Sequence, residues 1–88
     1  METIYNYPLV IEDHVSVIMP SNAKILCVQV QDGTPCIWAL VNTEYTKTAR
    51  TFAWRGTGHS CTGLSANKYV GTIQLAEGQL VFHLFDLG

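Results

Sequence analysis

The stretch that decides the fold is KILCVQVQDGTPCIWALV, residues 24–41. Along its first eight residues the side chains alternate, which places Leu26, Val28 and Val30 on one face. A repeat of two residues is the period of a strand with one buried face. We therefore predict a half-buried strand over residues 24–31.

A β-hairpin is predicted within the same stretch. Asp32-Gly33 stands between two apolar runs, and this pair is the strongest short-range hairpin signal, because both residue types tolerate the positive φ of a two-residue turn. The run from Cys36 to Val41 contains only apolar residues, which predicts a partner strand covered on both faces.

Five more segments have strand character, and no window holds a helical period over three turns. These segments are Thr3–Ile11, His14–Met19, Ala49–Arg55, Tyr69–Leu75 and Leu80–Leu87. The predicted fold class is all-β, with about seven short antiparallel strands in a small sandwich or a partly open barrel. Pro8 lacks a ladder donor, so the first strand is expected to lie at a sheet edge or to break there. The nearly all-apolar last strand is either central or an edge that a partner subunit covers.

The composition restricts the classes of protein to which this chain can belong. With 88 residues it forms one domain, residues 1–88, and its 14% charged residues and net charge of −2 exclude a disordered tail. Five lysines and arginines are too few for a nucleic-acid binder that works by charge. No apolar run is long enough to cross a bilayer, and the N-terminus does not have the pattern of a secretory signal. We therefore expect a cytosolic protein that does not bind membranes.

The cysteines and the low charge lead to two further expectations. Cys27, Cys36 and Cys61 are an odd number without a CxxC pair, which favours reduced thiols, with the first two in the core, over a disulfide framework or a structural zinc site. A surface with few charges on a small core favours self-association, so we expect a homo-oligomer.

The most chemically suggestive segment lies at the start of a predicted loop over residues 56–68. It reads Arg55-Gly56-Thr57-Gly58-His59-Ser60-Cys61. Two glycines within three residues let the backbone turn sharply and direct several N–H groups to one point. The side chains of Arg55, Thr57, His59 and Ser60 add donors, which suits an anion such as a phosphate. The alternative is a glycine-rich turn with a structural role only. A second polar loop is expected over residues 42–48.

Two other residue types could complete such a site. Trp54 precedes the glycine loop and could stack on a base or sugar, whereas Trp38 lies in an apolar strand and is expected in the core. Arg50 shares a strand face with Phe52 and Trp54, so it either sits at the strand end in water or reaches a phosphate in a pocket between subunits. The candidate ligand-binding residues are therefore Arg50, Trp54, Arg55, Gly56, Thr57, Gly58, His59 and Ser60.

No catalytic constellation is present in the sequence. His83 alternates with Val81 and Phe85, which is typical of a core or interface histidine with satisfied hydrogen bonds. No pair of acids is spaced for acid–base work, and no strand–elbow–helix pattern supports Ser60 as a nucleophile. We therefore predict a protein that is not an enzyme, with no metal and no cofactor.

Four segments resemble those of a family of short tailed-bacteriophage proteins of unknown function. They are residues 4–9, residues 23–35, Gly56-Thr57-Gly58-His59, and residues 69–72 with 81–83. The resemblance covers nearly the whole chain. It implies a small phage product in the host bacterial cytoplasm, where accessory proteins of this size commonly act against host defence.

Three functions are open at this point. The first is a protein that binds and sequesters a small phosphate-containing, nucleotide-derived immune signal without catalysis, using the loop after Trp54. The second is an inhibitor that binds a host defence protein, as anti-CRISPR proteins do, by pairing the last strand or the edge near Pro8 with a partner sheet. The third is a small virion or assembly component. We favour the first.

Overall fold

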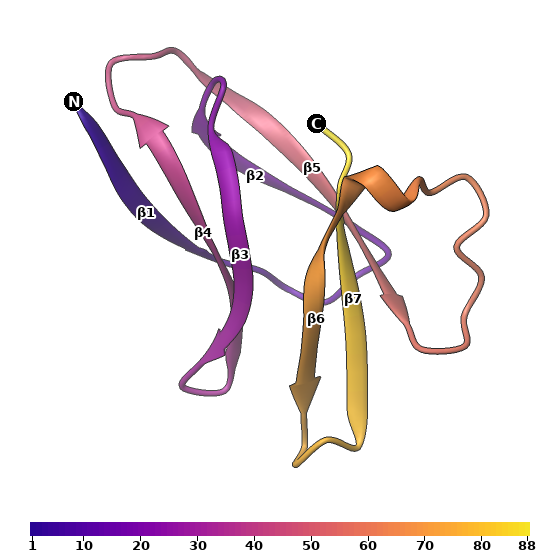
Figure 1. Cartoon of the computed structure of the whole chain (residues 1–88). Coiled ribbons are helices and arrows are strands. Elements are labelled where there is room, and N and C mark those ends of the chain that lie inside the picture. The colour runs from indigo at the N-terminus through magenta and orange to yellow at the C-terminus, as the bar shows by residue number, and fades with distance from the viewer.

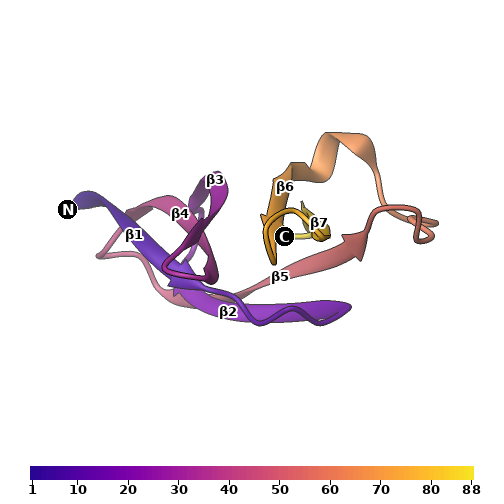
Figure 2. The ribbon, with the colours of Figure 1, turned by 90° about the horizontal axis from the view of Figure 1, so that it is seen from below.

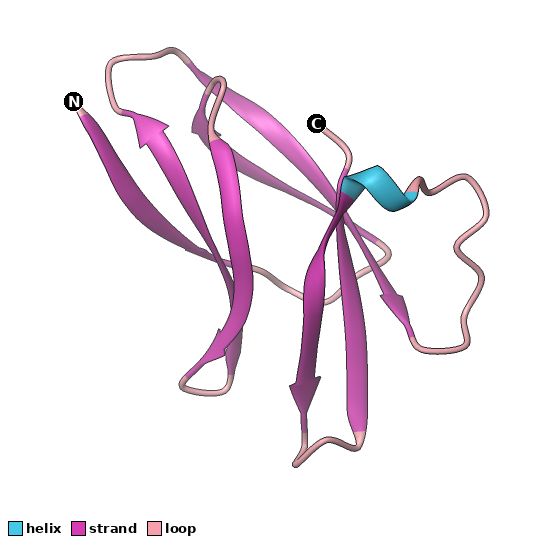
Figure 3. Ribbon diagram, viewed as in Figure 1, coloured by secondary structure: helices cyan, strands magenta, loops and turns pink.

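The computed structural model describes residues 1–88 and confirms the all-β prediction (Figures 1 and 3). Its strands are β1 (Glu2–Pro8), β2 (His14–Pro20), β3 (Lys24–Gln31), β4 (Thr34–Asn42), β5 (Lys47–Gly56), β6 (Tyr69–Leu75) and β7 (Leu80–Asp86). A single 3-10 turn, η1 (Ala66–Lys68), precedes β6. No helix is long or apolar enough to cross a membrane.

The strands form two antiparallel sheets that do not close into a barrel (Figure 2). One sheet has the order β1-β4-β3 and the other the order β2-β5-β7-β6. No ladder hydrogen bonds join β3 to β6, and the two edges meet through side chains instead. The approach is close at Gly71, where an added Cβ would lie 3.0 Å from Val28 Cγ1.

The β3–β4 hairpin forms at the predicted turn, with φ of 50° at Asp32 and 81° at Gly33. The predicted alternation of β3 is wrong at Leu26, because a register shift between Ile25 and Cys27 inserts a bulge there. The extra residue moves Ile25 to the inner face beside Val28 and leaves Leu26 50% exposed. A bulge of this kind changes which residues share a face without changing the strand's length.

Several predicted boundaries and environments are also corrected. β1 ends at Pro8, on an edge strand as predicted, and Leu9 continues into the core with its N–H bonded to Pro35 O at 2.9 Å. β4 is covered on one face only, because Trp38 and Leu40 on its outer face are half-buried rather than in the core. β7 takes the central of its two predicted places, between β5 and β6. The loops are shorter than predicted, since β5 already begins at Lys47.

The core lies between the inner faces of the two sheets. Its fully buried members include Ile37 from the three-stranded sheet, and Phe52 and Leu84 from the four-stranded sheet. Cys36 is buried, Cys27 is half-buried and Cys61 is exposed, and all three thiols are free. Arg50 lies on the same inner face as Phe52, near one end of this core.

Candidate functional site

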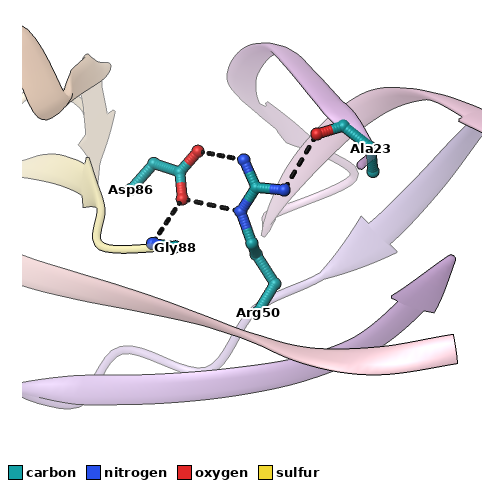
Figure 4. Close-up of polar contacts among 4 residues, drawn as sticks. All are labelled: Ala23, Arg50, Asp86 and Gly88. Atoms are coloured by element: carbon teal, nitrogen blue, oxygen red, sulfur yellow. Dashed lines mark hydrogen bonds and ion pairs between the residues drawn. The ribbon is translucent and has the colours of Figure 1, made fainter. Parts of the chain in front are cut away.

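Arg50 and Asp86 form a bidentate ion pair between β5 and β7 (Figure 4). Arg50 Nε donates to Asp86 Oδ1 at 2.9 Å and Nη2 donates to Oδ2 at 2.7 Å. The remaining amino group, Nη1, donates to the carbonyl oxygen of Ala23 at 2.8 Å. The pair therefore connects the four-stranded sheet to the start of β3. Arg50 lies on the predicted face of its strand, and its partner there is a carboxylate of the same chain.

The surroundings of the pair favour both charges. Burial alone would raise the pKa of Asp86, but the Arg50 guanidinium, the Gly88 N–H and the nearby Lys68 ammonium hold it below its usual value. The hydrogen bond to Asp86 raises the pKa of Arg50 in turn. Both side chains are about four-fifths covered, at 22% and 19% exposure. The pair is thus more than a surface salt bridge.

A cleft of about 410 Å³ opens beside this pair, where β3 and β6 face each other. We call it the seam cleft. It is lined by Ile25, Leu26, Arg50, Asn67, Lys68, Tyr69, Val70, Asp86 and Gly88. The side chains lining it carry two cations against one carboxylate, and that carboxylate is already paired with Arg50.

The seam cleft still has free donors. An arginine carries five N–H donors, and the contacts to Asp86 and Ala23 use three of those of Arg50. Asn67 Oδ1 accepts a hydrogen bond from Ser65 Oγ at 2.6 Å, so the amide nitrogen of Asn67 is free to donate. The Lys68 ammonium makes no ion pair within 4 Å. Tyr69 also lines the cleft, but its ring packs edge-on against Phe85 and its hydroxyl reaches His83 on the outer face of the sheet.

The glycine loop predicted as the ligand site lies at the other end of β5. Thr57, Gly58, His59 and Ser60 are exposed, and Gly58 has φ of 87° in a turn closed by the bond from His59 N–H to Gly56 O. Thr57 N–H also has a partner, Val81 O at 3.3 Å. Two of the backbone donors assumed for an anion are therefore used within the fold.

The side chains next to the loop also have hydrogen-bond or packing partners within the fold. Arg55 Nη1 donates to the carbonyl oxygens of Asp13 and Trp54, at 3.1 and 2.7 Å. The His59 ring lies over Gly56, where an added Cβ would meet Nδ1 at 3.0 Å. On either side of His59 is a small hollow, of about 290 and about 160 Å³, and the smaller one is also lined by Glu12 and Asp13.

Trp54 is a core residue in this fold. Its side chain is 2% exposed and its Nε1 donates to Val10 O at 3.0 Å, so neither indole face is open to a ligand. Arg50 is separated from Gly56 by six residues of one strand, roughly 20 Å at 3.3 Å per residue. The eight candidate residues therefore do not come together: Arg50 lines the seam cleft, and the loop lies at the other end.

His83 lies on the outer face of the four-stranded sheet, half-buried and with both ring nitrogens in contact with hydroxyl groups. Thr57 Oγ1 lies 2.7 Å from Nε2, and Thr72 Oγ1 and the Tyr69 hydroxyl lie 2.9 and 3.1 Å from Nδ1. The Tyr69 hydroxyl also bonds to Thr72 Oγ1. This histidine ties the glycine loop to β6 and β7. No three His, Cys, Asp or Glu side chains come close enough to hold a metal ion.

A family described as a domain of unknown function, DUF7352, matches residues 1–88. The chain belongs to the DUF7352 family. No curated protein and no solved structure matches it significantly.

Sequence reasoning missed three residues that line the seam cleft of this DUF7352 domain: Asn67, Lys68 and Tyr69. The sequence predicts them at the end of a loop and the start of a strand, and only the packing of β6 against β3 brings them near Arg50. One signal was available for a fourth, Asp86. It is the single acid in the apolar run of β7, as Arg50 is the single cation on the inner face of β5.

Proposed function

We propose that this DUF7352 domain binds a small phosphate-containing, nucleotide-derived ligand in the seam cleft and sequesters it without catalysis. The observation that carries the proposal is the joint presence there of free donors on three side chains, Arg50, Asn67 and Lys68, two of which are cations. A nucleotide needs donors for its phosphate, and these three side chains supply them.

Size and charge support the seam cleft over the loop. Its volume of about 410 Å³ falls within the range of about 300–1,000 Å³ that is usual for small-molecule sites. Lys68 offers an unpaired ammonium, and Arg50 keeps two N–H donors at a guanidinium that Asp86 holds in place. Near the loop, by contrast, the carboxylates of Glu12 and Asp13 would repel a phosphate.

The biological role proposed for this binding is counter-defence. The support is the resemblance of four segments to tailed-phage proteins, and the host bacterial cytoplasm is the compartment proposed for this action. A protein that only binds lowers the free signal in proportion to the number of its sites. Its effect therefore depends on tight binding and high abundance rather than on turnover.

The test uses the protein purified from a lysate that contains nucleotide signals. Native mass spectrometry is expected to show a retained small molecule, and heat release should free a nucleotide. With purified linear and cyclic mono- and dinucleotides, the melting temperature should rise with concentration. No retained molecule, together with no shift for any nucleotide, would refute the proposal.

Two variants locate the site. Lys68→Gln removes the free cation of the seam cleft and should weaken binding about tenfold, which is the loss of one charge-assisted contact. Lys47→Gln removes an equal charge from an exposed position outside the cleft and should leave binding unchanged. If His59→Ala weakens binding and Lys68→Gln does not, the ligand occupies the glycine loop instead.

A second function, binding of a host defence protein, is favoured by one observation. β1 has an open edge, because only β4 pairs with it, and it exposes Ile4 and Tyr5. A partner strand could extend the sheet there, next to Pro8. β7 cannot take this role, since β5 and β6 already flank it. Stoichiometric co-purification of one host complex, lost on replacing Ile4 by Pro, is the expected result.

A further inference from the structure

The outer face of the three-stranded sheet exposes apolar side chains that this chain covers only in part. Leu40 and Trp38 lie in its central strand, with Ile4 directly opposite Leu40 on β1 and Cys27 directly opposite Trp38 on β3. Ile4 is 55% exposed and the other three are half-buried. Because cross-strand neighbours contact each other, these four side chains form one continuous patch.

Two charges border this patch at one end, and their signs are opposite. Glu2 on β1 pairs in register with Asn42, and Lys24 on β3 pairs with Leu40. Both are exposed, and they flank the central strand β4 on its two sides. They have no partner within their own chain: neither forms an ion pair within 4 Å.

We propose that this face binds a second copy of the chain, sheet against sheet, about a two-fold axis parallel to β4. Such an axis exchanges the two flanking strands and keeps the position along the strand. It therefore brings Glu2 of each copy to the Lys24 side of the other, with an offset of two residues or roughly 7 Å along the strand, and it makes Trp38 and Leu40 meet their own counterparts. The charge pattern is self-complementary only in this orientation: a perpendicular axis would carry both charges to the opposite end of the face.

The arrangement is also compatible with the way sheets pack. Two sheets stack about 10 Å apart, with strand directions within about 30° of each other. A rotation of that size shifts the ends of the strands by a few ångströms, which the flexible four-carbon stem of lysine can follow. The proposal does not depend on ligand binding, because none of these residues lines the seam cleft.

The decisive experiment is a charge swap measured by sedimentation velocity over a range of protein concentrations. The natural chain is expected to dimerise. Lys24→Glu sets like charges against each other twice per dimer, so the dissociation constant should rise about tenfold or more. The double variant Lys24→Glu with Glu2→Lys again brings opposite charges together, with the two signs exchanged, and should recover the dimer. Lys47→Glu makes the same charge change on the other sheet and should have no effect.

A second measurement follows the patch directly. Trp54 is buried, so a soluble quencher of fluorescence reports mainly on Trp38. Quenching should fall as the natural chain is concentrated, and it should not fall for Lys24→Glu. A chain that stays monomeric at all concentrations overturns the proposal. A dimer whose dissociation constant is unchanged by Lys24→Glu also overturns it, since that dimer forms through another surface such as the β1 or β2 edge.

Discussion

Arg50 and Asp86, 36 residues apart in the chain, face each other from the inner sides of β5 and β7 through two hydrogen bonds of 2.9 and 2.7 Å. A third bond, from Arg50 to Ala23 O, extends the contact to the other sheet. The pair forms part of the wall of the seam cleft, and it also closes one end of the core. Its removal should therefore affect both stability and binding.

Breaking the ion pair should destabilise the fold. Arg50→Met leaves the Asp86 carboxylate without its partner in a largely covered position, and we expect a loss of about 2–4 kcal/mol. The free energy of unfolding in urea is the measurement. Lys47→Met, an exposed cation on the same strand, should change it by less than about 0.5 kcal/mol. Equal effects of the two substitutions would contradict the structural role of the pair.

The same pair predicts acid sensitivity. The folded pKa of Asp86 lies below its ordinary value, so the unfolded chain binds the proton more readily. The pair therefore stabilises the fold above the ordinary pKa of an aspartate, about 4, and this contribution is lost as the pH falls through the lower folded pKa. Asp86→Asn should be less stable near neutral pH and should lose less stability on acidification. Asp32→Asn, in an exposed turn, should keep the slope of the natural protein.

Trp54 should matter for stability more than for binding. Trp54→Phe removes the hydrogen bond to Val10 O and part of a buried ring, so we expect a loss of about 1–3 kcal/mol. Trp38→Phe, at a half-buried position, is the matched control and should cost less. Chemical denaturation gives both values. If Trp54→Phe abolishes nucleotide binding in a protein that is still folded, the glycine-loop hypothesis for the site is revived.

The close approach at Gly71 makes a specific steric prediction. Gly71→Ala places a Cβ 3.0 Å from Val28 Cγ1 and should cost about 1–3 kcal/mol by overpacking. Val28→Ala alone should cost about 1–2 kcal/mol as a cavity. The double variant should lose less than the sum of the two, because the smaller side chain makes room for the added methyl group. If the two losses of stability add strictly, the contact between Gly71 and Val28 does not set the distance between the sheets.

The sequence predicted those parts of the fold that depend on local chemistry. The Asp32-Gly33 turn and the bounds of β3 and β6 follow from backbone preference and a period of two. The bulge at Leu26 could not be predicted, because nothing in the alternation marks where a residue leaves the ladder. Only the pairing of β3 with β4 defines the position of the bulge.

The candidate site is harder to predict because residues that are neighbours in the sequence are not neighbours in space. Trp54 through Ser60 are neighbours in the chain, yet alternation and the turn send Trp54 into the core and the loop into water. Arg50 was placed on the right face, but its partner Asp86 comes from another strand. Lys68 and Tyr69 reach Arg50 only through the contact of the two sheets.

The facing edges of β3 and β6 have one more effect. Each edge blocks the other from recruiting a strand of a foreign chain, although the two share no ladder. Only β1 and β2 then remain as templates for fibril-type growth, and each ends in a proline that cannot donate to an added strand. Growth by strand addition should accordingly be confined to these two short borders, away from their proline ends.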